Sequence, residues 1–167
     1  MAADASGNSP TRVLFVCLGN ICRSPLAEGV FRNLVDEAGL SDRFLIDSAG
    51  TGSWHVGERP DARAAMVAKE HGVELDTRAR QVTERDLHDF DHVLAMDREN
   101  LLSLKRMAGS SGGDAEIELL RAYDPDPDGD DVPDPYYGGV SGFENVYDIV
   151  ARSCDALLKR LRVAAGR

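Results

Sequence analysis

Short apolar runs alternate along this chain with longer segments of helical periodicity, and this alternation constrains the fold more than any other feature. The runs have the length and β-branched content of buried strands, and they cover residues 12–16, 44–47, 92–96 and 117–120. The helical segments cover residues 24–39, 61–71, 98–107 and 142–162. Strands that alternate with helices pair into a parallel sheet covered on both faces. We therefore predict an α/β, three-layer Rossmann-like fold with a four-stranded parallel sheet flanked by helices on both faces.

The length of the chain suits one domain, because 167 residues are enough to bury a hydrophobic core. Residues 1–10 are polar and lack the basic and apolar regions of a secretory signal. We expect a disordered tail there and a single domain over residues 11–163. No apolar run approaches the roughly 20 residues that cross a bilayer. The expected location is cytoplasmic, with no membrane partner, although export without a signal would leave no trace of this kind.

The formal net charge of −10 argues against nucleic acid as a partner, because binding a polyanion needs clustered lysines and arginines. A small anionic ligand must then be held by backbone amides and a well-placed arginine. The three cysteines, Cys17, Cys22 and Cys154, suit a reducing compartment. The four histidines are scattered among charged residues without zinc spacing, so we expect no metal and no cofactor.

The segment from Cys17 to Ser24 lies between a predicted strand and a predicted helix. A tight turn at such a place points successive backbone N–H groups inward and forms a cradle for an anion. Gly19 and Asn20 are residue types that tolerate the positive φ of this turn. Arg23 can grip a phosphoryl group with two parallel hydrogen bonds, as a lysine cannot. Ser24, which precedes a proline, is predicted to be the N-cap of the helix.

Cys17 stands at the start of this cradle, where the backbone amides, the helix dipole and Arg23 all stabilise a thiolate. It can therefore act as a nucleophile without a histidine base. The alternative is a buried structural cysteine, and a Cys-x5-Arg pattern alone occurs by chance in many chains. The strand before the pattern, the glycine within it and the Ser-Pro after it favour the catalytic interpretation.

The run Val-Cys-Leu-Gly-Asn-Ile-Cys-Arg-Ser-Pro at residues 16–25 resembles the signature of the low-molecular-weight protein tyrosine phosphatases, bacterial type. Further matching segments cover nearly everything after the first ten residues, at 47–51, 79–81, 95–97, 119–125, 134–137 and 143–147. The resemblance implies an enzyme that hydrolyses phosphotyrosine and aryl phosphates through a cysteinyl-phosphate intermediate. It also implies that Cys17 is the nucleophile and that Arg23 binds the phosphate and stabilises the transition state.

The leaving oxygen needs a proton and the water of the second step needs a base, and one carboxyl group can serve both needs. Residues 123–139 are rich in Asp, Pro and Gly and long for a loop, which itself indicates function. The candidate carboxylates are Asp124, Asp126, Asp128, Asp130, Asp131 and Asp134. Composition cannot choose among them, whereas the resemblance selects Asp134, before Pro-Tyr-Tyr. We expect neighbouring carboxylates to help this residue hold its proton.

The resemblance also implies a set of residues that bind substrate: Leu18, Gly19, Asn20, Ile21, Cys22, Ser24, Trp54, Tyr136 and Tyr137. A phosphotyrosine ring in a deep cleft needs flat apolar walls, whereas phosphoserine would reach the nucleophile poorly. Ser48, Thr77 and Asp97 are implied to brace the cradle from behind. Thr77 stands where many relatives carry a histidine, so we expect a looser network there.

The role of Cys22 stays open between a small buried residue and a thiol that captures an oxidised Cys17 as a reversible disulfide, as the resemblance suggests. Cys154 is expected only to pack. The expected partners are tyrosine-phosphorylated proteins, with phosphate and vanadate as inhibitory anions. A small phosphate ester is an alternative natural substrate. We expect a monomer with weak self-association through exposed aromatic side chains.

Two other functions compete with the phosphatase. A thiol-dependent arsenate reductase of the same fold would need two further cysteines on a mobile segment, and residues 73–92 contain none. A non-catalytic phosphotyrosine reader would be expected to lack Cys17 or Asp134, and both are present. The sequence therefore favours the phosphatase.

Overall fold

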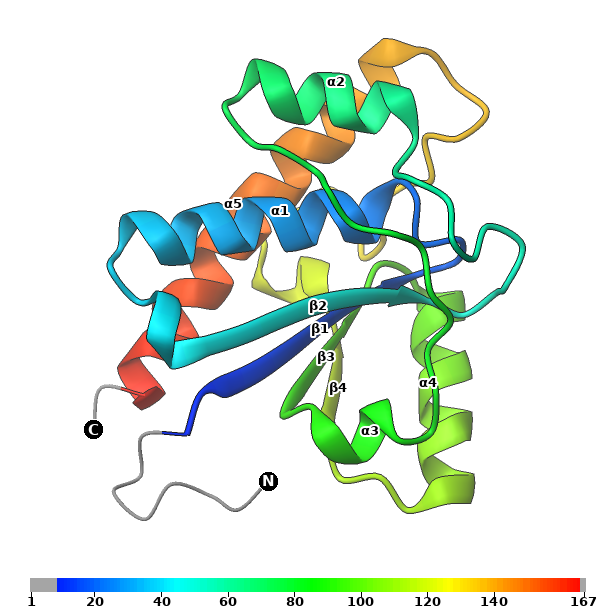
Figure 1. Ribbon diagram of the computed structural model, residues 1–167, viewed down its shortest axis with the longest axis vertical. Coiled ribbons are helices and arrows are strands. Elements are labelled where there is room, and N and C mark those ends of the chain that lie inside the picture. Colours follow the sequence, from blue (N-terminus) through cyan, green and yellow to red (C-terminus); the bar gives the residue numbers. More distant parts are fainter. Residues whose placement is uncertain (1–8, 166–167) are drawn as a thin grey trace.

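The computed structural model describes residues 9–165, and its centre is one parallel sheet of four strands (Figure 1). The strands are β1 Thr11–Cys17, β2 Phe44–Gly50, β3 His92–Ala95 and β4 Glu116–Leu119. They lie in the order β2-β1-β3-β4, and all three pairings are parallel. The four carboxyl ends therefore share one edge, and Cys17 lies on it. Residues 1–8 of the predicted tail fall outside the described range, so the disorder and the domain boundaries stay predictions.

Helices cover both faces of this sheet. They are α1 Arg23–Glu37, α2 Ala62–Glu70, α3 Asp86–Asp89, α4 Arg98–Ser111 and α5 Val140–Ala165, with 3-10 turns η1 Ser41–Arg43 and η2 Leu120–Tyr123. Figure 1 shows α1, α2 and α5 over one face and α3 and α4 over the other. The predicted three-layer α/β fold is confirmed. Across the described residues, no helix combines the length and the apolarity that crossing a bilayer requires.

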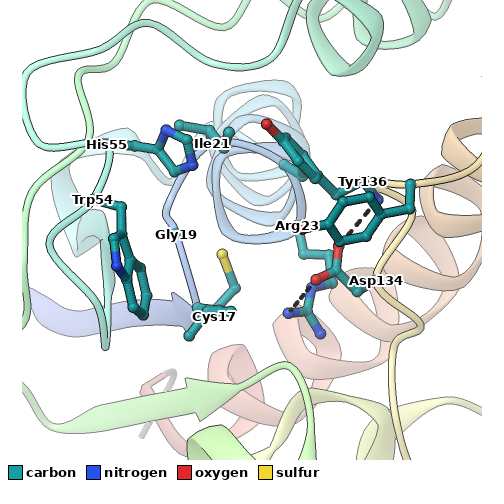
Figure 2. A pocket seen from close by; sticks show the side chains of 11 residues that line it. Cys17, Gly19, Ile21, Arg23, Trp54, His55, Asp134 and Tyr136 are labelled. Carbon is teal, nitrogen blue, oxygen red and sulfur yellow. Dashed lines mark hydrogen bonds and ion pairs between the residues drawn. The ribbon is translucent and has the colours of Figure 1, made fainter.

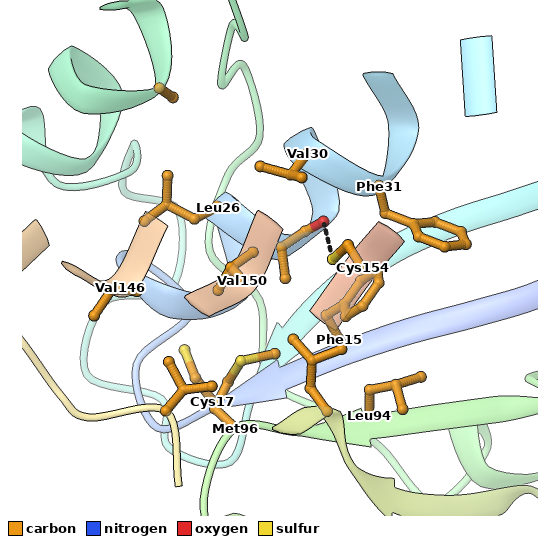
Figure 3. Close-up of a cluster of buried hydrophobic side chains, with 14 of the residues drawn as sticks. Phe15, Cys17, Leu26, Val30, Phe31, Leu94, Met96, Val146, Val150 and Cys154 are labelled. Carbon is orange, nitrogen blue, oxygen red and sulfur yellow. Dashed lines mark hydrogen bonds between the residues drawn. The ribbon is translucent and has the colours of Figure 1, made fainter. Parts of the chain in front are cut away.

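The inner strand β1 is buried on both faces, and its side chains alternate between two cores. Val13 and Phe15 belong to the core that contains α1 and α5, whereas Leu14 and Val16 belong to the core on the side of α4. In the first core, Phe15 meets Phe31 of α1 edge to face, with 5.6 Å between the ring centroids (Figure 3). Burial on both faces explains why this run is continuously apolar.

Three local predictions are wrong or incomplete. Ser24 is not the N-cap of α1, because the helix begins at Arg23 and Cys22 stands at the cap position without a side-chain cap bond. α4 extends past the end predicted at residue 107 and reaches Ser111, just before Gly112, which has a φ of 73°. The sequence pattern did not predict α3, since four residues are too few to show a period.

Candidate active site

Residues from three separate segments surround a cavity of about 380 Å³. Figure 2 shows Cys17 on its floor with the sulfur directed inward. The lining residues are Cys17, Leu18, Gly19, Ile21, Cys22, Arg23, Trp54, His55, Asp134, Tyr136 and Tyr137. All of them belong to the predicted site except His55, for which the one sequence signal is its place next to Trp54. Asn20 and Ser24, predicted to bind substrate, lie behind the cavity wall rather than on it.

The cysteine loop, residues 17–23, turns at Asn20, which has a positive φ of 58°. The turn allows the Asn20 N–H to donate to the Cys17 Sγ at 3.2 Å. Because α1 starts at Arg23, its first N–H groups add positive potential close to the sulfur. Of the two residues expected to tolerate a positive φ, Asn20 adopts one and Gly19 does not. A glycine fits there because a Cβ would lie only 3.0 Å from the ring of His55.

Behind the cysteine loop, polar side chains form a continuous chain of hydrogen bonds. The Ser24 Oγ lies 3.0 Å from the Cys17 Sγ and accepts from the Asn20 Nδ2 at 2.8 Å. Since Asn20 supplies that donor, the hydroxyl proton of Ser24 can point at the sulfur. The Asn20 Nδ2 also donates to the Ser48 Oγ at 3.0 Å, and its Oδ1 accepts from the Arg80 N–H at 3.0 Å. This network of hydrogen bonds holds the cysteine loop in place behind the sulfur.

The network of hydrogen bonds ends at Glu28, a carboxylate with 4% exposure that the sequence did not single out for the site. The Ser48 Oγ donates to it at 2.6 Å, and Arg32 donates to it at 2.8 Å. Burial raises the pKa of Glu28, and the bonds from Ser48 and Arg32 offset this only in part. Thr77 lies outside the network and lines a separate hollow together with Glu28 and Arg32. Within the described part of the chain, no hydrogen bond joins Thr77 to the network, so its bracing role stays a prediction.

Arg23 lies at the edge of the cavity with only 3% of its side chain exposed. Its Nη1 donates to the Asp97 Oδ2 at 2.7 Å and to the Val132 O at 3.0 Å. Both hydrogens of Nη1 are thus used, and the edge formed by Nε and Nη2 remains for a ligand. Burial alone would lower the pKa of Arg23, but the charges of Cys17, Asp97 and Asp134 outweigh it and raise the pKa. The arginine stays charged.

Of the six aspartates in the acidic loop, residues 124–139, only Asp134 lines the cavity. Its Oδ2 lies 3.7 Å from the Arg23 Nη2, and its Oδ1 accepts from the Tyr136 N–H at 3.1 Å. Four of the others contact arginines elsewhere: Asp124 with Arg121 and Arg152, Asp128 with Arg121, Asp130 with Arg98, and Asp131 with the Arg98 N–H. These four carboxylates are therefore bound elsewhere, and the help that neighbouring carboxylates were expected to give Asp134 stays a prediction.

Aromatic side chains form the walls at the mouth of the cavity (Figure 2). Trp54 is 70% exposed and Tyr137 is 95% exposed. Tyr136 is half-buried, and its ring lies 6.2 Å from that of His55 between centroids. The Trp54 ring packs over Gly52, where it already occupies the space of a Cβ. The mouth thus offers flat apolar surfaces to an aromatic ligand.

The other two cysteines differ from Cys17 in their surroundings. Burial, followed by the charge of Asp61, raises the pKa of Cys22, and burial raises the pKa of Cys154. Both are therefore protonated thiols at neutral pH. Cys22 lines the cavity, whereas Cys154 packs in the core (Figure 3). All three cysteines are free, so a disulfide between Cys17 and Cys22 stays a prediction.

Within the described residues, one group of side chains has a spacing that could hold a metal ion. His92, Glu116 and Glu118 bring their donor atoms within 4.8 Å of one another. His92 and Glu116 are the first residues of β3 and β4, whereas Cys17 is the last residue of β1. The group therefore lies at the edge of the sheet opposite to Cys17. Glu118 accepts from the Tyr123 hydroxyl at 2.7 Å, and the His92 Nδ1, which has no hydrogen-bond partner among the described residues, lies 3.5 Å from Glu116.

The fold and the cavity define an α/β protein that can bind an anion beside a cysteine, between a strand end and a helix N-terminus. The family model for "Low molecular weight phosphotyrosine protein phosphatase" matches residues 12–165. A relative of that name from Sus scrofa is 47% identical over 151 residues, covering 90% of this chain and 95% of the relative. The chain belongs to the low molecular weight phosphotyrosine protein phosphatase family.

Solved structures agree with this assignment. The crystal structure of YfkJ from Bacillus subtilis matches with a TM-score of 0.87 and 44% identity, covering 93% of this chain and 97% of that one. The crystal structure of DARP, a drosophila arginine phosphatase, matches with a TM-score of 0.85 and 38% identity, covering 90% of this chain and 97% of that one.

Proposed function

We propose that this chain hydrolyses phosphotyrosine, with Cys17 as nucleophile, Arg23 as phosphate ligand and Asp134 as general acid and base. The observation that carries the proposal is the convergence of these three side chains on one cavity, from β1, α1 and the acidic loop. Cys17 and Arg23 share one short loop, whereas Asp134 is distant from both in the sequence, so only the fold brings it to them. Membership of the family supports the same assignment.

In the first step the Cys17 thiolate attacks phosphorus, and the bond from phosphorus to the phenolic oxygen breaks. The leaving oxygen takes the proton of Asp134. The free edge of Arg23 and the N–H groups of the cysteine loop bind the phosphoryl oxygens, whose charge they stabilise in the transition state. In the second step Asp134 takes a proton from water, the water oxygen attacks phosphorus, and the sulfur–phosphorus bond breaks. Inorganic phosphate leaves, and the thiolate is restored.

The shape of the mouth favours phosphotyrosine as the substrate group. A ring between Trp54 and Tyr136 would carry its phosphate down to Cys17, whereas phosphoserine is too short to use these walls. The likeness to a drosophila arginine phosphatase makes phosphoarginine a second substrate to test. Asp134 is the one carboxylate among the lining residues, and the proposed mechanism needs it protonated. The described residues therefore give the cavity no other carboxylate that could pair with the guanidinium of phosphoarginine.

A substrate panel tests the proposal, with Cys17→Ser as the matched inactive variant. The panel contains p-nitrophenyl phosphate and peptides that carry phosphotyrosine, phosphoserine or phosphoarginine. We expect phosphate release from the first two alone, inhibition by phosphate and vanadate, and an acid-quenched phosphoprotein modified at Cys17. Binding of the phosphotyrosine peptide without turnover would support a reader instead, and thioredoxin-coupled reduction of arsenate would support a reductase.

Further parts of the proposal concern partners, place and oxidation. Tyrosine-phosphorylated proteins are the proposed substrates of a cytoplasmic monomer that self-associates weakly.

Cys17 and Cys22 line the same cavity. We propose that peroxide oxidises Cys17 to the sulfenic acid, that the Cys22 sulfur attacks it, and that water leaves as a disulfide forms. Mass spectrometry after peroxide treatment should find this disulfide, and thiol reductants should restore activity. Sulfinic acid at Cys17 without any disulfide would contradict the protective role.

A further inference from the structure

The backbone that carries Asp134 is tied to the rest of the protein on both of its sides. On the N-terminal side the tie is Val132. Its N–H donates to the Met96 O at 2.8 Å, and its carbonyl accepts from the Arg23 Nη1 at 3.0 Å. This side of the acidic loop is therefore bound to the end of β3 and to the phosphate-binding arginine.

On the C-terminal side the tie is Arg63, the second residue of α2. Its Nη2 donates to the Tyr136 O and its Nη1 donates to the Gly138 O, each at 3.0 Å. Residues 133–139 are all described, and these two are the hydrogen bonds by which they reach another element; their others are local. The hydrogen bonds from the loop after Asp134 to another element thus all come from one guanidinium, in addition to the packing of Tyr136 against the core.

Arg63 is itself held by Asp61, the N-cap of α2. The Nε and Nη2 of Arg63 bind the two carboxylate oxygens of Asp61 at 3.1 and 3.0 Å. The Asp61 N–H donates to the Ile21 O of the cysteine loop at 2.7 Å. A line of hydrogen bonds therefore runs from the cysteine loop through Asp61 and Arg63 to the acidic loop. We call this pair of residues the strap, and neither of them lines the cavity.

The geometry of the strap requires an arginine. The guanidinium bonds to two carbonyls and one carboxylate in its plane, and its carbon lies 4.6 Å from the centroid of the Phe143 ring on α5. A lysine has the charge but not the planar set of donors, so it cannot make all these contacts at once. Figure 1 shows α2 beside the start of α5, which is where the acidic loop ends.

We propose that Arg63 is a positioning residue, which sets the position of Asp134 relative to Cys17 and so controls proton transfer to the leaving group. The inference rests on the proposed function. Asp134 is 44% exposed and its own contact with Arg23 is 3.7 Å long, so the two backbone ties help to keep it over the cavity rather than in solvent. Loss of Arg63 should leave the cysteine loop and its anion site intact, because Asn20, Ser24 and Arg23 do not depend on it.

Leaving-group dependence separates positioning from general damage. Phenol is a poorer leaving group than p-nitrophenol, and its departure depends more on the acid. We expect Arg63→Ala to lower kcat/KM for phenyl phosphate by about tenfold or more, and for p-nitrophenyl phosphate by about threefold or less. Arg63→Lys should behave like Arg63→Ala. The matched control is Arg78→Ala, which removes an exposed arginine that donates to the Gly57 O and not to the acidic loop. Equal losses with both substrates would overturn the proposal.

The same substitution in an Asp134→Asn background gives a second test, because there is then no acid to position. Arg63→Ala should add about twofold or less to the loss for phenyl phosphate in that background. A loss as large as in the wild-type background would show that Arg63 acts through something other than Asp134. Inhibition by inorganic phosphate should be the same in wild type and Arg63→Ala.

Amide hydrogen exchange tests the strap without any turnover. Arg63→Ala should speed exchange at residues 136–139 while exchange in β1 and α1 stays unchanged, and unchanged exchange in the acidic loop would overturn the strap. Inactive but folded wild-type protein would count against the proposed function and not against the strap. If the wild-type protein is active and the Arg63→Ala variant has the same kinetics and the same amide exchange, the result would count against the strap alone.

Discussion

The cysteine loop and the acidic loop face the same cavity, but different interactions hold them. The cysteine loop is short and buried, with Cys17 2% and Arg23 3% exposed. The bonds to its sulfur are local, since Asn20 and Ser24 are close to Cys17 in the sequence, and buried bonds from Asn20 and Arg23 to distant segments hold the loop. The acidic loop is long and exposed, and arginines from η2, α2, α4 and α5 hold it in place.

The difference corresponds to the chemistry that each loop performs in the proposed mechanism. A thiolate and a phosphoryl group are stabilised best by dipoles that are already oriented and need not reorganise during the reaction. A general acid must instead meet the leaving oxygen after the substrate has entered, so its loop lies at the open side of the cavity. Substitutions in the cysteine loop should therefore abolish catalysis, whereas substitutions in the acidic loop should lower the rate or destabilise the fold.

The largest effect is expected for Cys17→Ser, which removes the nucleophile. Turnover of p-nitrophenyl phosphate should fall on the order of 10⁵-fold, because serine at this place has no base to activate it. Circular dichroism should show an unchanged fold. Cys154→Ala, which removes the cysteine in the core away from the cavity, should keep its activity. Appreciable turnover by Cys17→Ser would mean that the cysteine loop does not supply the nucleophile.

Asp134→Asn should have the next largest effect, and it tests the assignment of the acid among six aspartates. We expect kcat/KM for phenyl phosphate to fall about 10²- to 10³-fold, with a smaller loss for p-nitrophenyl phosphate. The matched control is Asp130→Asn in the same loop, whose carboxylate is 68% exposed and lies 3.4 Å from Arg98. If both variants lost activity equally, the acid would not be Asp134.

Asp124→Asn should affect stability rather than chemistry. The Asp124 side chain is fully buried between Arg121 and Arg152. Removing one partner of such a group costs about 3 kcal/mol of unfolding free energy, measured by urea denaturation at pH 7. Asp128→Asn, at 89% exposure, is the control and should cost about 1 kcal/mol or less. The activity of each folded variant should stay near wild type.

The stability difference between wild type and Asp124→Asn should depend on pH. Burial alone would raise the pKa of Asp124, but the bonds from Arg152 and Arg121 outweigh it, so the pKa lies below its usual value. The carboxylate therefore stabilises the fold fully above about pH 4, and this contribution is lost as the pH falls through the lower folded value. A difference that stayed constant down to about pH 2 would contradict this origin.

Trp54→Ala should have the smallest effect. Loss of an exposed wall should raise KM for a phosphotyrosine peptide about fivefold and leave kcat nearly unchanged, because the ring contacts substrate equally in the ground and transition states. Trp54→Phe should recover most of the affinity. An unchanged KM in Trp54→Ala would show that the substrate ring binds elsewhere in the cavity.

The sequence by itself determined the four strands, their parallel direction, their alternation with helices and the place of the cysteine loop. These features depend on local patterns, namely apolar runs, helical periods and residues that tolerate a particular φ. Even there, local reasoning misassigned Ser24 and did not find the reason for a glycine at position 19. Ser24 turns its hydroxyl to the sulfur rather than to the helix end, and Gly19 makes room for His55 rather than adopting a positive φ.

The family resemblance selected Asp134 from the sequence, but only the tertiary structure showed that it lies at the cavity and which residues hold it there. Composition does not separate six similar carboxylates in one irregular loop. Their places depend on cations that the fold brings from distant elements: Arg121 and Arg152 hold Asp124, while Arg63 holds the backbone after Asp134. The physical reason is that backbone geometry is set between near neighbours in the chain, whereas ion pairs and guanidinium–carbonyl bonds form between groups that meet only after folding.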